Sequence, residues 1–192
     1  MTTRERIVNE ADRLFYERGY EHTSFADIAD AVGISRGNFY YHLKSKDEIL
    51  DAVIEKRMTA ISEMLRAWEN ESSSPSERIK RFILIVITNR PQIIRHGCPV
   101  GTLCSELAKL GHPAQPQSNQ LFALFRSWLC QQFVQLGHEA DADSLAMHVL
   151  AFSQGVAVLA HAFQDECFVE REAERMCAWL DAVAGEAMTK TE

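Results

Sequence analysis

The 192-residue sequence has little of what marks β-structure, membrane insertion or secretion. It contains five prolines, and no segment alternates polar and apolar residues as a half-buried strand does. No stretch approaches the roughly 18 uncharged apolar residues of a membrane span, and the N-terminus MTTRERIVNE lacks the apolar core of a signal peptide. We therefore expect an all-α, cytoplasmic protein that has no membrane partner.

The sequence contains few cysteines and fewer positive than negative charges. The five cysteines are an odd number spread through helical segments, which argues against a secreted disulfide framework. The 20 Lys and Arg residues are outnumbered by 27 Asp and Glu, for a net charge of -7, which argues at first against nucleic acid as a partner. No catalytic triad, carboxylate pair or Gly-rich phosphate loop occurs in a supporting context, so we expect no enzymatic activity.

Residues 35–46, SRGNFYYHLKSK, depart from this acidic balance because they contain no carboxylate. Arg36, Lys44 and Lys46 lie here together with three aromatic residues and a histidine. Contact with a phosphate depends on the charge within a Debye length, about 8 Å at physiological salt. A local basic patch can therefore bind phosphate in a protein that is acidic overall.

Three short helices are expected before residue 44, and a glycine follows each of the first two. A glycine-containing turn between the second and third predicts a helix-turn-helix, whose last helix lies in the DNA major groove. On a helical wheel, Phe39 and Leu43 face the other helices, whereas Gly37 and Tyr41 point away. The expected ranges are residues 3–18, Thr23 or Ser24 to Gly33, and Ser35 onward.

Helical periodicity continues to the C-terminus. A long fourth helix should begin at Ser45, where Glu48 completes a capping box with the Ser45 amide. The segment ENESSSPSE is a break, after which Ser74 caps the next helix. The segment RPQIIRHGCPVG is expected to be a turn-rich joint. Further helices are expected at residues 100–110, 116–136, 144–164 and 169–187.

The stretch FADIADAVGISRGNFYYHLKSKDEIL resembles the signature of TetR-type transcriptional repressors, small-x-G-β-branched-S-x-G-x-x-Y-x-H-F/L-x-S-K-x-x-L, and the resemblance covers residues 4–54. It implies a helix-turn-helix DNA-binding domain at residues 1–48. A long helix would join this to an effector-binding and dimerisation domain at residues 49–192. The implied partners are a palindromic DNA operator, a small-molecule effector and a second copy of the chain, with no cofactor.

The resemblance also implies which residues contact DNA. Asn38 and Arg36 are the best candidates for base edges, because an amide and a guanidinium pair bidentately with adenine and guanine. The other residues would mainly position the protein on the backbone, with Thr23 or Ser24 anchoring a phosphate. The full set is Thr23, Ser24, Ser35, Arg36, Gly37, Asn38, Tyr40, Tyr41, His42, Lys44 and Lys46.

Beyond residue 66 the resemblance is weak, and the sequence names neither effector nor operator. Apolar residues there either line an effector cavity or form ordinary core. The pocket candidates are Phe82, Cys104, Phe122, Phe125, Trp128, Met147 and Phe152. In the family the last two helices pair with their copies, although burial within one chain explains the pattern almost as well. The interface candidates are Gly155, Ala160, Met176, Leu180 and Val183.

Cys98 and Cys104 form a second point of interest. They could sense oxidants or electrophiles, form a disulfide if their Cα atoms come within about 7 Å, or be unreactive thiols. The spacing of His96, Cys98, Cys104 and His112 fits no compact zinc site, so no metal is expected.

The leading hypothesis is a repressor that a small molecule releases from its operator. The alternatives are a thiol-based sensor of oxidants or electrophiles and, in a different class, a helical ligand-binding or catalytic domain with a relic DNA module. The intact basic patch argues against the relic.

Overall fold

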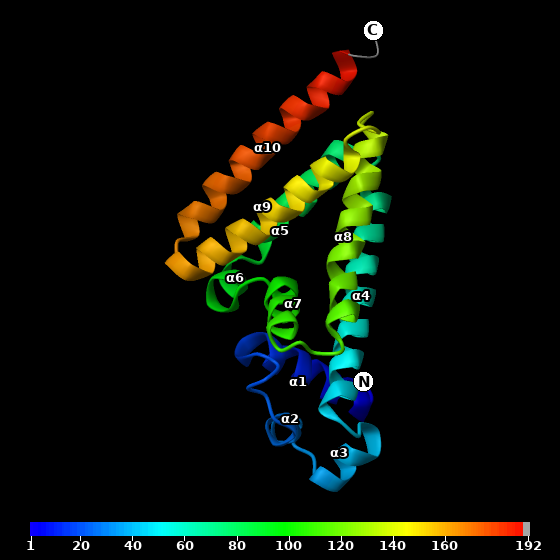
Figure 1. The fold of residues 1–192 in the computed structure, drawn as a ribbon, viewed down its shortest axis with the longest axis vertical. Coiled ribbons are helices and arrows are strands. Elements are labelled where there is room, and N and C mark those ends of the chain that lie inside the picture. The colour runs from blue at the N-terminus through cyan, green and yellow to red at the C-terminus, as the bar shows by residue number, and fades with distance from the viewer. Residues whose placement is uncertain (190–192) are drawn as a thin grey trace. The chain divides into compact units, whose positions relative to one another are not determined.

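The computed structural model describes residues 1–189, except for the side chains of Arg36 and of residues 186–189. This part of the chain is built from α-helices and contains no strand, which confirms the predicted all-α class (Figure 1). In chain order the helices are α1 (Thr3–Arg18), α2 (Phe25–Val32), α3 (Arg36–His42), α4 (Lys46–Glu71), α5 (Pro75–Thr88), α6 (Arg90–His96), α7 (Pro99–Lys109), α8 (Gln115–Gln135), α9 (Ala142–Phe163) and α10 (Glu166–Thr189).

Packing divides these helices into two units. The first comprises Met1–Ala60 and Pro99–Leu121, and the second comprises Ile61–Cys98 and the chain from Phe122 onward. By packing, therefore, the first part of α4 and all of α7 belong with α1, α2 and α3. The predicted boundary after residue 48 separates DNA binding from effector binding and dimerisation, and it stays a prediction.

Side-chain caps explain where α1 and α2 begin. Thr2 and Glu5 form a capping box at α1, in which each side chain accepts a hydrogen bond from the other residue's amide. Ser24 and Asp27 form the same box at α2, so Ser24 and not Thr23 is the cap. Gly33 ends α2 in the left-handed conformation, with φ of 71°, which glycine adopts without steric cost.

The start of α4 differs in one detail from the prediction. The Ser45 hydroxyl accepts a hydrogen bond from the Glu48 amide at 3.0 Å, as expected. The Glu48 carboxylate, however, accepts from the amide of Lys44 at 2.7 Å, one residue before the predicted donor. Ser74 caps α5 as predicted, because its hydroxyl accepts a hydrogen bond from the Glu77 amide at 3.4 Å.

The predicted turn-rich joint after residue 89 is wrong, because it contains helix α6. Pro91 lies in the first turn of α6, where a missing N–H costs no helical hydrogen bond. The Ile94 carbonyl near the end of this helix accepts from His161 Nδ1 at 2.8 Å and from Gln164 Nε2 at 2.7 Å. These bonds from the end of α9 compensate for acceptors that a short helix leaves open.

Five helices of the first unit contribute to one core. Apolar side chains from α1, α2, α3, α4 and α7 pack together and are almost completely buried. They include Ile7, Leu14, Ile28, Phe39, Leu43, Leu50, Leu103 and Leu107. Helix α7 is therefore part of the framework that holds the helix-turn-helix.

A carboxylate from α7 is hydrogen-bonded to the turn between α1 and α2. The two oxygens of Glu106 accept the amide N–H groups of Tyr20 and Glu21, each at 2.9 Å. Gly19 precedes these amides with φ of 90°, and a Cβ there would lie 2.9 Å from Glu106 Oε1. Glycine is required at this position for its positive φ and for the close approach of the carboxylate.

The N-terminal end of α7 is held by a buried arginine. Arg57 is 9% exposed, and its Nε donates to Asp12 Oδ1 at 2.7 Å. A terminal nitrogen of the same guanidinium donates to the Pro99 carbonyl. The fork geometry of arginine thus joins α1, α4 and α7 through one side chain.

The second unit packs α5, α6, α9 and α10 against one another. Its core includes Ile79, Ile83, Phe133 and Val149, each fully buried. Of the helices described here, only α9 is long and apolar enough to cross a bilayer by length and composition. A core helix of a soluble protein passes the same test, so this property is no sign of a membrane span.

Candidate nucleic-acid interface

Helix α3 is fixed to the first unit by one face. Phe39 and Leu43, one turn apart, are both fully buried. The hydroxyl of Ser35 accepts a hydrogen bond from the amide of Asn38 at 3.4 Å and caps the helix. The wheel prediction for the inward face is therefore confirmed, and the opposite face is left to solvent.

The exposed face of α3 carries polar and aromatic side chains. Tyr41 is 83% exposed and Tyr40 is 53% exposed. Asn38 and Lys44 are also exposed, whereas His42 is half-buried. At Gly37 an added Cβ would meet no atom within 4 Å, so this position is open surface that another molecule can approach closely. The side chain of Arg36 lies outside the described part of the chain.

Thr23 is not on this surface, which corrects the prediction for it. Its side chain is fully buried. Its hydroxyl donates to the Gly19 carbonyl at 2.7 Å and lies 3.3 Å from the Leu14 carbonyl. The hydroxyl thus satisfies backbone acceptors inside the unit and does not face a phosphate.

Ser24 is exposed, but it is already engaged by Asp27. Its hydroxyl and its amide donate to the Asp27 carboxylate at 2.5 Å and 2.7 Å. The hydrogen bonds from the side chain and the backbone of Ser24 hold the pKa of Asp27 below its ordinary value. At neutral pH a negative charge therefore sits at the N-terminus of α2, which weakens the attraction of this site for a phosphate.

Lys46 is directed into the first unit. Its ammonium lies 4.1 Å from the centroid of the Tyr20 ring and donates to the Glu21 carbonyl at 3.3 Å. Burial lowers the pKa of this lysine. A contact between Lys46 and DNA would require the ammonium to leave these partners, so Lys44 is the better-placed lysine.

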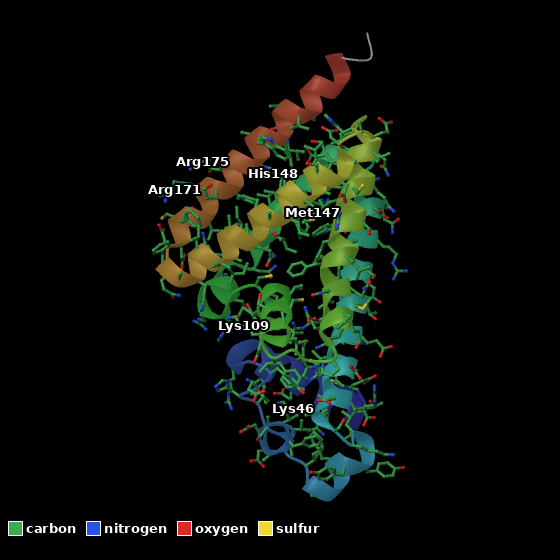
Figure 2. All side chains as sticks on the ribbon, viewed as in Figure 1. Lys46, Lys109, Met147, His148, Arg171 and Arg175 are labelled. Atoms are coloured by element: carbon green, nitrogen blue, oxygen red, sulfur yellow. The ribbon has the colours of Figure 1, made fainter. Side chains whose placement is uncertain are left out.

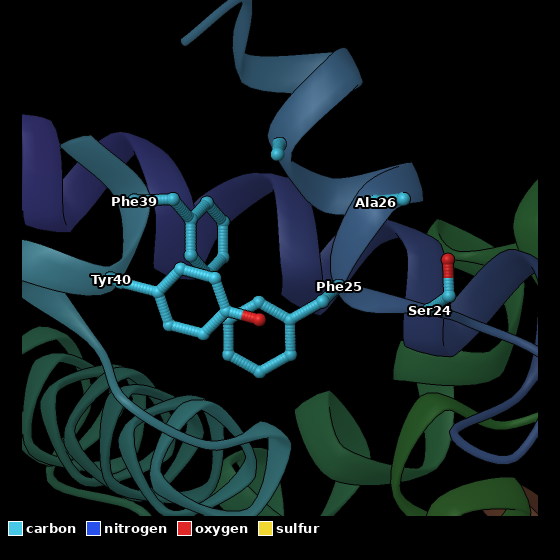
Figure 3. A pocket seen from close by; sticks show the side chains of 6 residues that line it. Ser24, Phe25, Ala26, Phe39 and Tyr40 are labelled. Atoms are coloured by element: carbon cyan, nitrogen blue, oxygen red, sulfur yellow. The ribbon is translucent and has the colours of Figure 1, made fainter. Parts of the chain in front are cut away.

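A ring contact that the sequence did not predict supports Tyr40. A pocket of about 190 Å3 lies between α2 and α3, and Figure 3 shows the rings of Phe25, Phe39 and Tyr40 along it. Phe25 stacks on Tyr40 with an interplanar angle of 14°. The residue spacing along the sequence gave no sign of this contact.

The predicted effector residues fall in different places. In the second unit, Phe82 and Phe125 meet edge to face with centroids 5.2 Å apart. Trp128 is 6% exposed and donates to Glu69 at 2.9 Å. Phe122 and Phe152 are half-buried in that unit.

Two members of the predicted pocket set do not join these aromatics. Met147 is 41% exposed, so it is not enclosed as a pocket residue would be. Cys104 belongs to the first unit, where it is buried and donates to the Ser118 carbonyl at 3.3 Å.

The cysteines give no further support to a thiol sensor. Cys98 is half-buried in the second unit, and its sulfur lies 3.6 Å from Nε2 of Gln154. Cys104 belongs to the first unit. Redox sensing by Cys98 and Cys104 stays a prediction. Across residues 1–189 no group of three or more His, Cys, Asp or Glu side chains is arranged to hold a metal ion.

The predicted dimer residues divide into two sets. Ala160, Met176 and Leu180 are buried inside the subunit, which corrects their assignment to an interface, and Val183 is half-buried. Gly155 lies on a different, exposed side of α9. This side, called here the α9 face, consists of Met147, Ala151, Gly155, Val158 and Leu159.

The two last helices expose different chemistry. Val158 is 64% exposed and Leu159 is 42% exposed, so the α9 face presents apolar side chains to solvent. In Figure 2, Met147 lies on α9, and Arg171 and Arg175 lie on α10. Both arginines are exposed. The solvent side of α10 is therefore charged where that of α9 is apolar.

Comparison with known proteins accounts for both parts of the chain. Residues 7–53 match the family described as bacterial regulatory proteins, tetR family. Residues 75–175 match the family described as transcriptional regulator LmrA/YxaF-like, C-terminal domain.

Relatives with known names or structures extend over most of the chain. An HTH-type transcriptional regulator from the lacX 3′ region of Lactococcus lactis subsp. lactis is 30% identical over 167 residues, 85% of each chain. The HTH-type transcriptional repressor DhaR of Mycobacterium sp. (strain GP1) is 25% identical over 98% of this chain and 94% of its own. A TetR transcriptional regulator from Legionella pneumophila, 29% identical, superposes with a TM-score of 0.81 over 95% of this chain and 97% of its own.

The resemblance read from the motif around α3 is thereby confirmed. The fold, the mounting of α3 and both family matches agree. The chain belongs to the TetR family and is a DNA-binding transcriptional regulator.

Proposed function

We propose that the protein is a repressor that binds a palindromic operator as a homodimer and leaves it when a small molecule binds. The exposed face of α3 is the observation that carries this proposal. It presents Asn38, Tyr40 and Tyr41 on a helix whose other side is buried in the core, and the exposed Lys44 follows directly after this helix. Among residues 35–46 no carboxylate opposes the approach of DNA. Asn38 and Arg36 are proposed to read bases, and the other residues to hold the backbone.

The α9 face is proposed as the dimer interface. Members of the TetR family bind operators as dimers and respond to small-molecule effectors. The small side chains at Ala151 and Gly155 permit close approach of a second helix, and Val158 and Leu159 gain burial there. On a palindromic operator, the α3 helices of the two copies are expected in successive major grooves, about 34–36 Å apart.

The effector is proposed to bind in the second unit, beside its aromatic side chains. Phe82 and Phe125 supply apolar ring surface, and Trp128 is paired with Trp68 at 5.7 Å between centroids. This composition suits an apolar or aromatic molecule. A coupling free energy of about 1–3 kcal/mol between the two ligands is enough for induction. No catalytic step is part of the proposal, and we place the protein in the cytoplasm.

Selection of duplexes from a randomised pool tests the DNA-binding proposal. The protein should enrich an inverted repeat, and sedimentation of the complex should show an even number of chains. Enriched sequences without two-fold symmetry, or a single chain on each duplex, would contradict it. The enriched duplex is called the selected operator below.

A ligand screen tests the release. Small aromatic compounds are added to the complex of protein and fluorescent selected operator, and anisotropy reports dissociation. An inducer that binds beside Trp128 should also change its emission, and Trp128→Phe should remove most of that change. Inducers that act without any effect on tryptophan emission would place the effector elsewhere.

Asn38 and Lys44 should behave differently when replaced by alanine. Asn38→Ala should cost about 1–3 kcal/mol on the selected operator and relax base preference at one position of each half-site, because an amide reads base edges. Lys44→Ala should weaken all sequences alike and lower the salt slope by about one, because an ammonium displaces one phosphate counterion. Titrations at several salt concentrations measure both quantities, and identical behaviour of the two variants would refute the assigned roles.

A further inference from the structure

Tyr40 is held from one side by an aromatic ring. The centroids of Phe25 and Tyr40 are 5.2 Å apart, and the planes are close to parallel. Phe25 in turn meets Phe39 edge to face at 4.8 Å, and Phe39 is fully buried. A line of three rings therefore connects the core of the first unit to an exposed side chain of α3 (Figure 3).

A pocket beside these rings leaves Tyr40 without close packing on one side. The pocket of about 190 Å3 is lined by Ser24, Ala26 and Ala29 in addition to the three rings. The small alanine side chains do not fill the space next to Phe25 and Tyr40. Close packing on every side therefore does not fix Tyr40, and the stack with Phe25 supplies the restraint.

We propose that Phe25 is a positioning residue for operator binding, which holds Tyr40 ready to contact the DNA backbone. This inference rests on the proposed contact between Tyr40 and DNA. A tyrosine that is already ordered loses less rotamer freedom when it binds. In a helix-turn-helix the helix before the recognition helix, here α2, crosses the DNA backbone. The stack of Phe25 on Tyr40 joins this helix to α3. We therefore expect Tyr40 to be held on the side that meets a DNA strand. Phe25 itself need not touch DNA.

A double-mutant cycle on the selected operator tests the proposal. Phe25→Leu removes the ring and keeps apolar volume, and it should weaken binding about two- to tenfold in the presence of Tyr40. In a Tyr40→Ala background the same change should have almost no further effect. Phe25→Tyr keeps the ring and should restore binding, whereas Phe25→Met should resemble Phe25→Leu.

The outcomes of the cycle distinguish failure of the inference about Phe25 from failure of the proposed contact between Tyr40 and DNA. If Phe25→Leu weakens binding equally in both backgrounds, or in neither, Phe25 does not act through Tyr40 and the inference fails. If Tyr40→Ala itself leaves affinity unchanged, the proposed contact of Tyr40 with DNA is wrong. Thermal unfolding of each variant shows whether Phe25→Leu is folded, and Phe25→Met takes its place in the cycle if it is not.

Discussion

Val158→Asp should convert the dimer to monomers and lower affinity for the selected operator by at least two orders of magnitude. Val158 is 64% exposed in the subunit, more than Leu159 or Met147 of the same α9 face. In a dimer built on that face, each new carboxylate would be buried against apolar side chains of the partner without a counter-charge, which costs several kcal/mol. A monomer presents one recognition helix to one half-site and loses the contacts of the second.

Val134→Asp is the matched control. Val134 is 41% exposed on α8, outside the α9 face, so the same change should leave the dimer intact. Sedimentation equilibrium measures the oligomeric state of both variants, and anisotropy measures operator affinity. If Val158→Asp remains a dimer, or if Val134→Asp dissociates as readily, the α9 face is not the interface.

Leu107→Ala should destabilise the unit that carries the helix-turn-helix by about 2–5 kcal/mol. Leu107 is fully buried in the core shared by α1, α2, α3, α4 and α7. Loss of its side chain leaves a cavity in this core. The effect is expected in the first unit even though α7 directly follows α6 of the second unit in the sequence. Leu110→Ala is the control, because Leu110 is 43% exposed and its loss should change stability by less than about 0.5 kcal/mol.

The distribution of aromatic residues allows each unit to be followed separately. The three tryptophans, Trp68, Trp128 and Trp179, lie in the second unit, and the four tyrosines lie in the first. In urea, Leu107→Ala should shift the tyrosine signal to lower denaturant by more than it shifts the tryptophan signal. A shift confined to tryptophan, or one no larger than that of Leu110→Ala, would show that α7 does not support the first unit.

Local signals in the sequence predicted the helix-turn-helix in detail. The cap of α2 was left open between Thr23 and Ser24, whereas the helix starts at Ser35 and Ser45 and the glycine at residue 33 were recognised from short spacings, because these residues act on neighbouring backbone groups. The inward face of Phe39 and Leu43 follows from helical periodicity in the same way.

Features that depend on distant partners were not predicted. Glu106 accepts hydrogen bonds from the backbone 85 and 86 residues away, and His112 Nε2 lies 3.2 Å from the Tyr20 hydroxyl. No spacing in the sequence signals such pairs. Helix α6 was missed because Pro91 was read as a turn signal, although proline is tolerated in a first helical turn.

The interface candidates show the same limit. The family resemblance and the small or apolar residues of the last two helices suggested these candidates but did not distinguish the face buried in the subunit from the exposed one. Ala160 and Leu180 proved to be buried in the subunit, whereas Val158 and Leu159 are exposed. Burial depends on which helix packs against which, and this is a property of the tertiary structure.

The most direct test of the central claim is the ratio of two affinities measured at one salt concentration. One duplex is the selected operator, and the other has both half-sites scrambled at constant length and base composition. A repressor that reads bases with α3 should prefer the operator by a factor of about 10³ or more. A ratio near one would mean that the protein binds only the phosphate backbone, and it would contradict the account of a sequence-specific repressor.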